Sequence, residues 1–404
     1  MRVFLIVLDG AGIGAAKDCS LFNDPPTVNT ILNSLKKSTE EGMNLNLNNL
    51  SLLGLHKILQ YKTPTITDDE LVKLGFKNDV NIISSYGIME EKSFGKDTIT
   101  GHWEISGIIL DKGFNTFEHF PKELIEEFEK KTNRKVIGNK PASGTEIIKE
   151  LGEEHIRTGN LIVYTSADSV FQIAAHIDVV NLDELYKICE IAYELVKPYR
   201  IARVIARPFA GKNGDFYRLN DKRKDFAIPP PSKTILDLLK ESNLEVISVG
   251  KIVDIFANKG ITKSYKISGN KNIFQKVIEL SDEDFEGLVF ANLVDFDTIY
   301  GHRQDYKGWA LALQEFDDMV FDLINKLKKD DILIITADHG NDPTDNSTDH
   351  TRENVPVIIV NNNKKEEYLG IKPSFRFITH VIQSLFKEKI KEKLSLEEFE
   401  GEKV

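Results

Sequence analysis

The sequence is poor in cysteine and lacks both long apolar runs and a surplus of basic residues. Cys19 and Cys189 are its two cysteines among 404 residues. They lie far apart and form no Cys-x-x-Cys pair of the kind that binds metal or cycles redox state. Cys189 shares a helical stripe with Leu185, Ile188 and Ala192, so we expect it to be a buried core thiol in a reducing cytoplasm.

The other absences exclude two classes of partner. No run of about 18 apolar residues occurs, which argues against a membrane-spanning helix. Lys and Arg number 52 against 63 Asp and Glu, a net charge of −11, so the basic surplus needed for nucleic acid is missing. A strand is predicted within three residues of Met1, without a charged leader and apolar stretch, so no signal peptide is expected. We therefore expect a cytoplasmic protein that binds small molecules.

The length and a change of character along the chain predict two domains. At 404 residues the chain exceeds one ordinary hydrophobic core. Residues 112–225 contain a charged amphipathic helix (121–131), a loop punctuated by glycine and proline (136–145) and short strands. The polar, proline-rich stretch 220–231 is expected to be a linker. We predict a small α+β cap at 112–225, inserted into a core made of residues 1–111 and 226–404.

The core is predicted to be an α/β domain with a mostly parallel sheet flanked by helices. Residues 3–8 are continuously apolar, as in a central parallel strand, and residues 332–335 form a second such run. Asp9 directly follows the first run, and Asp338-His339 follow the second. Because open α/β sheets bind ligands at the carboxyl ends of their strands, we expect these side chains at one edge.

Carboxylates and imidazoles recur in the C-terminal third in a pattern that indicates metal binding. Asp295-Phe296-Asp297 follows an apolar run, His302 comes five residues later, and Asp349-His350 repeats the Asp-His pair. With Asp9, these residues offer ligands for two divalent ions, and the mixture suits Mn²⁺ or Zn²⁺ better than Ca²⁺. The remaining histidines lack such neighbours and are expected to be structural or surface residues: His56, His119, His155, His176 and His380.

A two-metal site needs a nucleophile, and the glycine-flanked segment 95–104 carries two hydroxyl groups, Thr98 and Thr100. A threonine hydroxyl is a poor nucleophile at neutral pH unless a divalent ion activates it. Both threonines are equally suited to cap the helix that follows. The residues alone leave the catalytic and the capping roles open.

Gly10, Gly12 and Ala15 offer a competing interpretation, because they formally match the dinucleotide-binding fingerprint after a strand. That fingerprint expects an acidic residue closing a second strand about 20 residues further on. Residues 24–29 instead form a proline-bearing loop without a preceding apolar strand. We therefore disfavour a dinucleotide site and expect these glycines to let the backbone pass close to an ion held by Asp9.

The ligand set resembles that of the alkaline phosphatase superfamily, and longer motifs resemble the prokaryotic phosphopentomutases within it. The match runs from Asp9 to Glu353. The motifs that carry it are Gly95-Lys96-Asp97-Thr98, Thr100-Gly101-His102-Trp103-Glu104, Gly138-Asn139-Lys140-Pro141-Ala142-Ser143-Gly144-Thr145-Glu146, Tyr164-Thr165-Ser166-Ala167-Asp168-Ser169-Val170, Val294-Asp295-Phe296-Asp297 and Thr336-Ala337-Asp338-His339-Gly340-Asn341-Asp342-Pro343.

The resemblance implies an alkaline-phosphatase-like fold and an isomerase. The implied reaction interconverts α-D-ribose 1-phosphate and D-ribose 5-phosphate, and the 2-deoxyribose equivalents, through a phosphothreonine enzyme and a 1,5-bisphosphate. It also implies two Mn²⁺ per subunit and a sugar bisphosphate activator, either ribose 1,5-bisphosphate or glucose 1,6-bisphosphate. Pentose phosphates would then be the small-molecule partners, with no membrane or nucleic acid involved.

The resemblance also assigns roles to individual residues. Thr98 matches the residue that carries the phosphoryl group and contacts the first ion. The other ligands implied for that ion are Asp9, Asp338 and His339. The ligands implied for the second ion are Asp297, His302 and His350. The residues implied to contact sugar and phosphate are Ser166, Asp168, Arg203, Arg218 and Lys251.

Three other functions remain to be weighed. One is a metal-dependent phosphatase or phosphodiesterase of the same superfamily. The second is a phosphoglycerate mutase, but that family has a serine where Thr98 stands. The third is a non-catalytic protein that binds metal or sugar phosphate, and the intact set of ligands for two adjacent ions argues against it.

Overall fold

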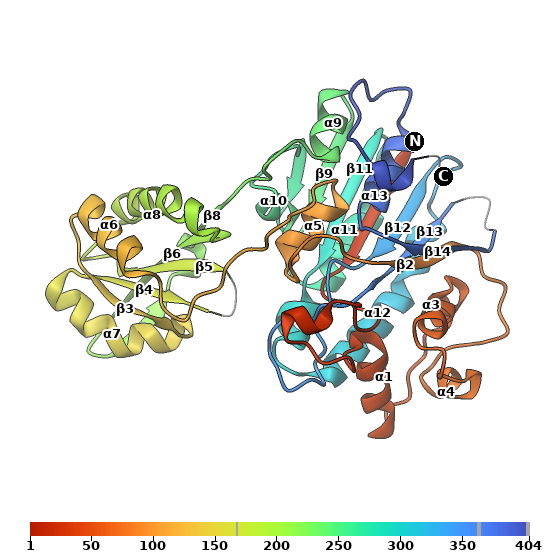
Figure 1. Cartoon of the computed structure of the whole chain (residues 1–404), viewed down its shortest axis with the longest axis horizontal. Coiled ribbons are helices and arrows are strands. Elements are labelled where there is room, and N and C mark those ends of the chain that lie inside the picture. The colour runs from red at the N-terminus through yellow and green to blue at the C-terminus, as the bar shows by residue number, and fades with distance from the viewer. Residues whose placement is uncertain (167–168, 362–364, 401–404) are drawn as a thin grey trace. The chain divides into compact units, whose positions relative to one another are not determined.

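The computed structural model describes residues 1–166, 169–361 and 365–400 and divides the chain into two compact units. The larger unit comprises Met1–Lys112 and Pro230–Val404, and the smaller unit is Gly113–Pro229. The smaller unit is thus an insertion between two segments of the larger one. Each unit has its own sheet, and both are visible in Figure 1.

The larger unit is built on a sheet in which, among the described residues, eight strands follow the order β10-β9-β11-β1-β12-β13-β2-β14. All pairings are parallel except the two made by β13. The strands are β1 (Arg2–Leu8), β2 (Ser85–Met89), β9 (Glu245–Val249), β10 (Lys263–Tyr265), β11 (Gly287–Leu293), β12 (Ile332–Thr336), β13 (Val355–Val360) and β14 (Glu367–Lys372).

The continuous apolar run of β1 explains its central position. Every residue of β1 is buried, and the strand pairs with β11 on one side and β12 on the other. Parallel strands covered on both faces have this composition. Because β1, β11, β12 and β2 run in the same direction, their carboxyl ends meet at one edge of the sheet.

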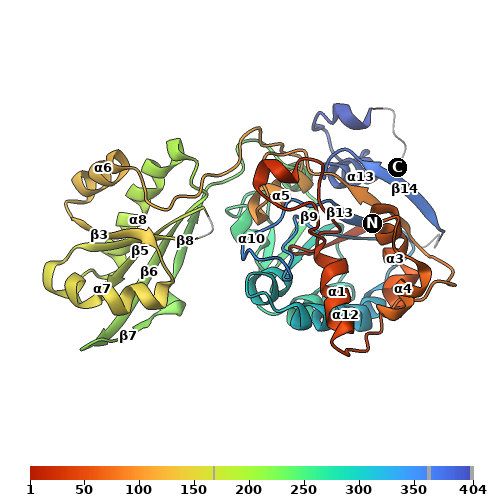
Figure 2. The same ribbon diagram turned by 60° about the horizontal axis from the view of Figure 1, so that its bottom comes forward.

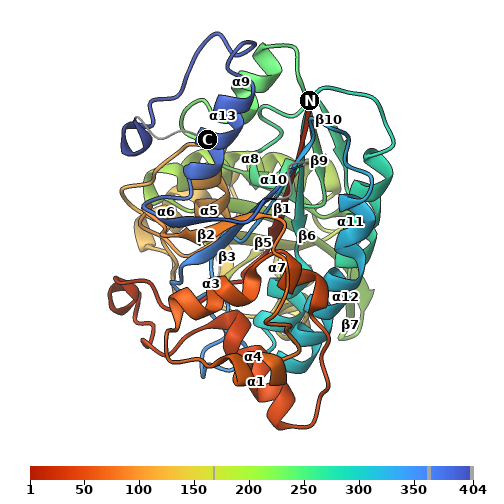
Figure 3. The same cartoon turned by 90° about the vertical axis from the view of Figure 1, so that its right-hand side faces the viewer.

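Helices cover both faces of this sheet, with α11 and α12 on one side and α5 and α13 on the other (Figure 3). A turn of π-helix (Phe296–Gly301) links β11 to the segment that precedes α12. The helices of the larger unit are α1 (Thr30–Glu40), α2 (Asn48–Leu52), α3 (Leu55–Lys62), α4 (Asp68–Lys73), α5 (Thr98–Ile105), α9 (Ile235–Glu241), α10 (Ile252–Ile255), α11 (Asn270–Leu280), α12 (Tyr306–Ile324) and α13 (Phe377–Leu385).

The smaller unit has a second sheet of order β3-β4-β5-β6-β7, in which β8 also pairs with β6. Helices α6 and α8 lie on one face and α7 lies on the other (Figure 2). Its elements are β3 (Val136–Pro141), β4 (Leu161–Thr165), β5 (Val170–His176), β6 (Arg203–Lys212), β7 (Asp215–Arg218), β8 (Lys224–Ala227), α6 (Lys122–Thr132), α7 (Gly144–Thr158) and α8 (Leu182–Val196). Cys189 lies on α8 and is fully buried in the hydrophobic core that α6 and α8 form with the sheet, as predicted.

Two local predictions were wrong in this unit. Most of the expected loop 136–145 is strand β3 followed by the first turn of α7. Pro141 is tolerated there because β3 is an edge strand, where a missing N–H group breaks no ladder. The expected linker 220–231 contains β8, which pairs with β6 and packs Phe226 against the core. The polar composition of this stretch gave no indication of a strand.

The search for membrane spans in the described part of the chain found no helix long and apolar enough to cross a bilayer. The longest helix among the described residues, α12, has 19 residues and carries four acidic side chains in its second half.

Candidate active site

The chemically active side chains gather at the carboxyl edge of the larger sheet. Asp9 directly follows β1, and Asp338-His339 follow β12. Asp297 lies in the π-helical turn after β11, and Thr98 is the first residue of α5, which follows β2. Four parallel strands therefore deliver these groups to the same edge.

The first cluster consists of Asp9, Asp338 and His339, all fully buried. His339 Nε2 lies 3.2 Å from Asp9 Oδ1 and 3.5 Å from Asp338 Oδ2. One ligand atom from each residue falls within 4.8 Å of the others, which is close enough to surround one ion. Thr98 Oγ1 joins this cluster at 3.2 Å from His339 Nε2 and 3.4 Å from Asp9 Oδ1.

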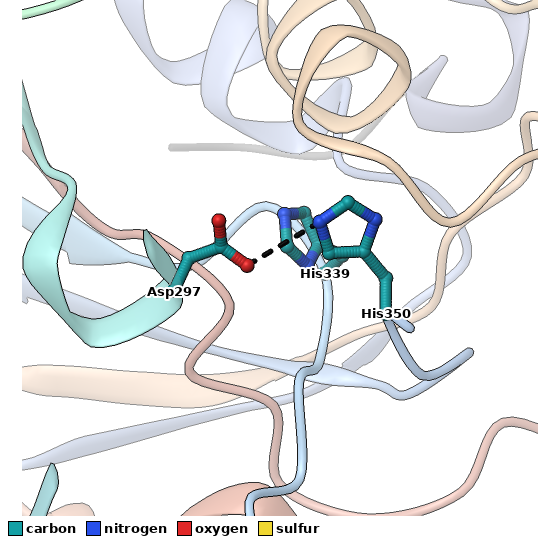
Figure 4. Close-up of side chains that lie close together, drawn as sticks. All are labelled: Asp297, His339 and His350. Atoms are coloured by element: carbon teal, nitrogen blue, oxygen red, sulfur yellow. Dashed lines mark ion pairs between the residues drawn. The ribbon is translucent and has the colours of Figure 1, made fainter. Parts of the chain in front are cut away.

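The second cluster is centred on Asp297, which is 2% exposed. Its Oδ1 lies 3.3 Å from His350 Nε2 and its Oδ2 lies 3.4 Å from His302 Nε2. Figure 4 shows Asp297 facing His350 with His339 beside them. Asp297, His339 and His350 also form a candidate metal-binding group, so His339 stands at the junction of the two clusters.

Two of the histidines are oriented by backbone carbonyl groups. His339 Nδ1 donates to the Gly340 carbonyl at 3.0 Å, and His302 Nδ1 donates to the Thr348 carbonyl at 2.7 Å. A histidine held in this way directs Nε2 away from the carbonyl, as histidine ligands of metals do. In both residues Nε2 faces a carboxylate of the cluster.

Three buried carboxylates and their neighbouring histidines shift one another's pKa values at this edge. Desolvation raises the pKa of Asp9, and the neighbouring carboxylates of Asp338 and Asp297 raise it further. Burial also disfavours a charged His339, but Asp338 and Asp9 outweigh it and raise the pKa of that imidazole well above its usual value. For Asp297, burial is outweighed by His350 and His302, so its pKa lies well below the usual value. Three buried carboxylates close enough for two of them to raise the pKa of the third are costly without compensating cations.

The donor set fits divalent metal ions. Asp338 Oδ2 is buried and accepts no hydrogen bond from the described residues. His102 Nδ1 lies 2.9 Å from it and also 2.9 Å from the Thr98 carbonyl oxygen. A buried carboxylate oxygen whose neighbours are imidazoles, in a cluster with two further carboxylates, matches the ligand preference of Mn²⁺ and Zn²⁺.

The structure separates the two threonines that the sequence left equivalent. Thr100 Oγ1 donates to Asp97 Oδ2 at 2.5 Å, and Asp97 caps α5 by accepting from the amides of Ile99 and Thr100. Thr100 therefore belongs to the cap of the helix. Thr98 Oγ1 instead faces Asp9 and His339 in the first cluster.

Two buried residues whose role the sequence did not reveal anchor the loop that carries Thr98. Arg352 donates to the carbonyls of Ser93 and Gly95 at 2.8 and 2.6 Å and pairs with Glu91 at 2.5 Å. Glu104 accepts from the amides of Ser93 and Phe375, among others. Glu104 ends the motif Thr100-Gly101-His102-Trp103-Glu104, and Arg352 directly follows Asp349-His350-Thr351. Neither pattern indicated which groups the two side chains contact.

Close packing between α5 and β12 requires the glycine that follows Thr100. A Cβ atom on Gly101 would lie 2.0 Å from the Asp338 carbonyl oxygen. Any larger residue would push α5 away from the end of β12. The glycine thus sets the approach of Thr98 to the first cluster.

The residues expected to contact substrate occupy both units. Lys251 follows β9, a neighbour of β11, and therefore lies at the same edge as the metal clusters. In the smaller unit, Ser166 follows β4, Arg203 begins β6 and Arg218 ends β7. Asp168 lies outside the described residues.

Comparison with known proteins identifies the family of this chain. A model described as the metalloenzyme superfamily matches residues 1–390. A phosphopentomutase of Caldanaerobacter subterraneus subsp. tengcongensis is 50% identical over 388 residues, which cover 95% of this chain and 94% of that one. A phosphopentomutase of Thermotoga maritima is 51% identical over 391 residues and 96% of each chain. This chain belongs to the phosphopentomutase family.

Membership in the phosphopentomutase family makes the chain an isomerase that acts as an intramolecular phosphotransferase. It also confirms the resemblance seen in the sequence and the predicted α/β, alkaline-phosphatase-like fold class. Among solved structures, alkaline phosphatase from the Antarctic bacterium TAB5 covers 96% of this chain and 97% of its own, with 13% identity and a TM-score of 0.36. That likeness is too distant to inform the site.

Proposed function

We propose that this protein is a phosphopentomutase that interconverts α-D-ribose 1-phosphate and D-ribose 5-phosphate, and the corresponding 2-deoxyribose phosphates. The observation that carries the proposal is the position of Thr98 Oγ1, 3.2 Å from His339 Nε2 and 3.4 Å from Asp9 Oδ1. A hydroxyl that lies within a cluster of metal ligands is suited to form a covalent phosphoryl intermediate. Identity of about half of all positions with phosphopentomutases supports the same reaction.

The proposed cycle begins with phosphorylated Thr98. A free hydroxyl of a pentose monophosphate attacks phosphorus, and the P–Oγ1 bond breaks as the new P–O bond forms. The attacking hydroxyl loses its proton and the departing Thr98 Oγ1 gains one, so that Thr98 regains its hydroxyl group. The product is a 1,5-bisphosphate. The bisphosphate then presents its other phosphate to Thr98 and the same exchange in reverse restores phosphothreonine, leaving an isomerised monophosphate. A sugar bisphosphate, either ribose 1,5-bisphosphate or glucose 1,6-bisphosphate, supplies the first phosphoryl group.

The two clusters divide the ligands that we propose for a pair of Mn²⁺ ions. Asp9, Asp338, His339 and Thr98 would hold one, and Asp297, His302 and His350 would hold the other. When bound, the ions activate the threonine oxygen and neutralise charge on the phosphoryl group. Arg352 and Glu104 keep the Thr98 loop in place, so that the nucleophile does not depend on the substrate for its position.

Recognition of the sugar phosphate is assigned to basic and polar residues. We propose that Arg203 and Arg218 bind the substrate phosphate, as arginine does through paired N–H donors. Ser166, Asp168 and Lys251 complete the proposed set. These groups supply local positive charge in a chain whose net charge is −11.

A single assay separates this function from phosphate hydrolysis. The purified protein is incubated with ribose 5-phosphate, Mn²⁺ and a trace of glucose 1,6-bisphosphate, and phosphorus NMR follows the products. We expect ribose 1-phosphate to appear up to a constant ratio, with little inorganic phosphate. Stoichiometric release of inorganic phosphate without ribose 1-phosphate would instead assign the protein as a phosphatase.

A further inference from the structure

Each of the three buried carboxylates in the clusters has one oxygen held by an N–H donor. Asp338 Oδ1 accepts from the backbone amide of Gly10 at 3.0 Å. Asp9 Oδ2 accepts from Asn292 Nδ2 at 2.9 Å, and Asp297 Oδ1 accepts from Asn341 Nδ2 at 2.7 Å. Because an ionised carboxylate only accepts hydrogen bonds, each asparagine must present its Nδ2 atom.

Asn292 is a polar interruption in an otherwise apolar strand. It is fully buried in β11, where its Cα pairs with that of Val7 on β1. Its Oδ1 is buried and has no hydrogen-bond partner among the described residues. An apolar side chain would avoid that unpaired acceptor, so the position retains the carboxamide at a cost in folding free energy.

Asn341 occupies a space that two glycines leave for it. A Cβ atom on Gly301 would lie 2.6 Å from Asn341 Cγ, and a Cβ atom on Gly10 would lie 3.2 Å from Asn341 Cβ. Asn341 is also fully buried, and its Oδ1 likewise lacks a hydrogen-bond partner within the described structure. The surrounding backbone is thus shaped around a carboxamide that has one useful contact, its N–H bond to Asp297.

We propose that Asn292 and Asn341 are paired positioning residues, one for each metal-ligand cluster, which fix the carboxylates of Asp9 and Asp297 in the orientation that binds metal. Asp9 Oδ1, the oxygen that Asn292 leaves free, lies 3.2 Å from His339 Nε2. Both oxygens of Asp297 face its cluster, with Oδ2 3.4 Å from His302 Nε2 and the Asn341-bound Oδ1 3.3 Å from His350 Nε2. Hydrogen bonds to the outer oxygen of a carboxylate ligand orient it and tune its affinity for metal.

The charge of the donor explains why an amide serves here. Lysine or arginine in either position would bring positive charge next to the ion and oppose its binding. Aspartate or glutamate would add a fourth carboxylate, when ionised, to a group that already contains Asp9, Asp297 and Asp338, and it could not donate. A carboxamide donates an N–H bond without changing the charge that the site offers to a metal and a phosphate.

The inference rests on the metal role in the proposed function, and its test uses Mn²⁺ alone, without sugar phosphate. The full-length protein is stripped with a chelator and titrated with MnCl₂ by calorimetry, for Asn292→Leu and Asn341→Leu. Asn292→Ala and Asn341→Ala repeat each deletion without filling the space. The matched control is Asn354→Leu, because Asn354 is 3% exposed in the same unit but bonds to Lys62 rather than to a cluster carboxylate.

We expect each cluster variant to bind one of two Mn²⁺ ions about 10- to 100-fold more weakly, in the range found for residues that support metal ligands. The melting temperature in chelator should stay near that of the unchanged protein, while the rise caused by Mn²⁺ should shrink. The control should bind both ions normally. Affinities within threefold of the unchanged protein, an equal loss in the control, or failure of both the Leu and the Ala forms to fold would overturn the inference. None of these results depends on whether the protein is a mutase, which the product assay decides separately.

Discussion

The two units gather opposite charges at their chemically distinctive positions. The larger unit brings Asp9, Asp297 and Asp338 together with histidines at one sheet edge. The smaller unit brings together arginines around Tyr164 and Asp225. The first arrangement favours bound cations, and the second is where we propose that the substrate phosphate binds.

The arginine cluster of the smaller unit is defined by its electrostatics and contacts. Arg223 Nε lies 2.6 Å from Asp225 Oδ1, and Arg203 Nη1 lies 3.9 Å from Asp225 Oδ2. Arg207 bonds to Gln172 at 2.9 Å, and burial lowers the pKa of its guanidinium. Arg218 belongs to the same group, because its charge acts on Arg207 and on Tyr164.

The largest expected loss of activity comes from removing a proposed metal ligand in the larger unit. Asp297→Ala and His339→Ala should each lose bound Mn²⁺ and nearly all mutase turnover, because no other described side chain replaces the missing donor. The fold should remain, since the apolar sheet core does not depend on either residue. Metal content is measured by atomic absorption and fold by circular dichroism, with the exposed His119→Ala as control. Full turnover with stoichiometric metal in either variant would remove these residues from the site.

Deleting the smaller unit tests whether the larger unit can bind metal without the arginine cluster. A chain in which residues 113–229 are replaced by a short flexible linker should still bind Mn²⁺, because all six proposed protein ligands and Thr98 lie in the larger unit. Mutase turnover should vanish, while weak Mn²⁺-dependent hydrolysis of an activated phosphate ester should survive. The comparison fails if the shortened protein still interconverts pentose phosphates, or if it folds without binding metal.

A single arginine of the smaller unit should affect substrate binding but not metal binding. Arg218→Ala should raise the KM for ribose 5-phosphate about 10- to 100-fold, as expected for loss of a charge-assisted hydrogen bond to phosphate worth about 1.5–3 kcal/mol. Steady-state kinetics measures KM, and calorimetry should find Mn²⁺ affinity unchanged. Arg157→Ala, at an exposed position on α7, is the control. An unchanged KM for Arg218→Ala would remove that residue from the substrate site.

The last comparison concerns the stability of the larger unit and a histidine outside both clusters. Burial, assisted by the charge of Lys57, lowers the pKa of His56 to about 4, and both its ring nitrogens lack hydrogen-bond partners in the described structure. The unfolded chain therefore binds a proton below pH 6.5 that the folded chain does not bind until about pH 4. Stability from this group is complete above pH 6.5 and is lost as pH falls toward 4.

His56→Leu should remove that dependence. Relative to the unchanged protein, the variant should gain unfolding free energy as pH falls from 6.5 to 4, by at most about 1.4 kcal/mol per pH unit. Urea denaturation of the metal-free protein at several pH values measures the difference. A constant difference across this range would mean that His56 does not titrate differently in the two states.

Much of the larger unit could be predicted because its signals are local. A continuously apolar run identified β1, and a carboxylate directly after it identified Asp9 as an edge residue. The elements of the smaller unit were harder, because β3 contains proline and β8 is polar, and their pairing with β4 and β6 depends on tertiary contacts. Asn292 and Asn341 were not predicted as functional, since their importance comes from contacts more than 40 residues distant in sequence.

The choice between Thr98 and Thr100 shows the same limit. Both hydroxyls fit a nucleophile or a cap when the sequence is considered alone. The structure distinguishes them through Asp97, which accepts from the Thr100 hydroxyl and so commits it to the cap of α5. Resemblance to a family pointed to Thr98, but the physical distinction needed the folded loop.

The most direct test of the central claim is the location of phosphate on the enzyme. The protein is incubated with glucose 1,6-bisphosphate and Mn²⁺, and peptide mass spectrometry locates the added phosphoryl group in the unchanged protein, Thr98→Ala and Thr100→Ala. We predict phosphate on Thr98 in the unchanged protein and in Thr100→Ala, and neither phosphate nor mutase activity in Thr98→Ala. Phosphate on Thr100, or a Thr98→Ala protein that is still phosphorylated and active, would contradict the account.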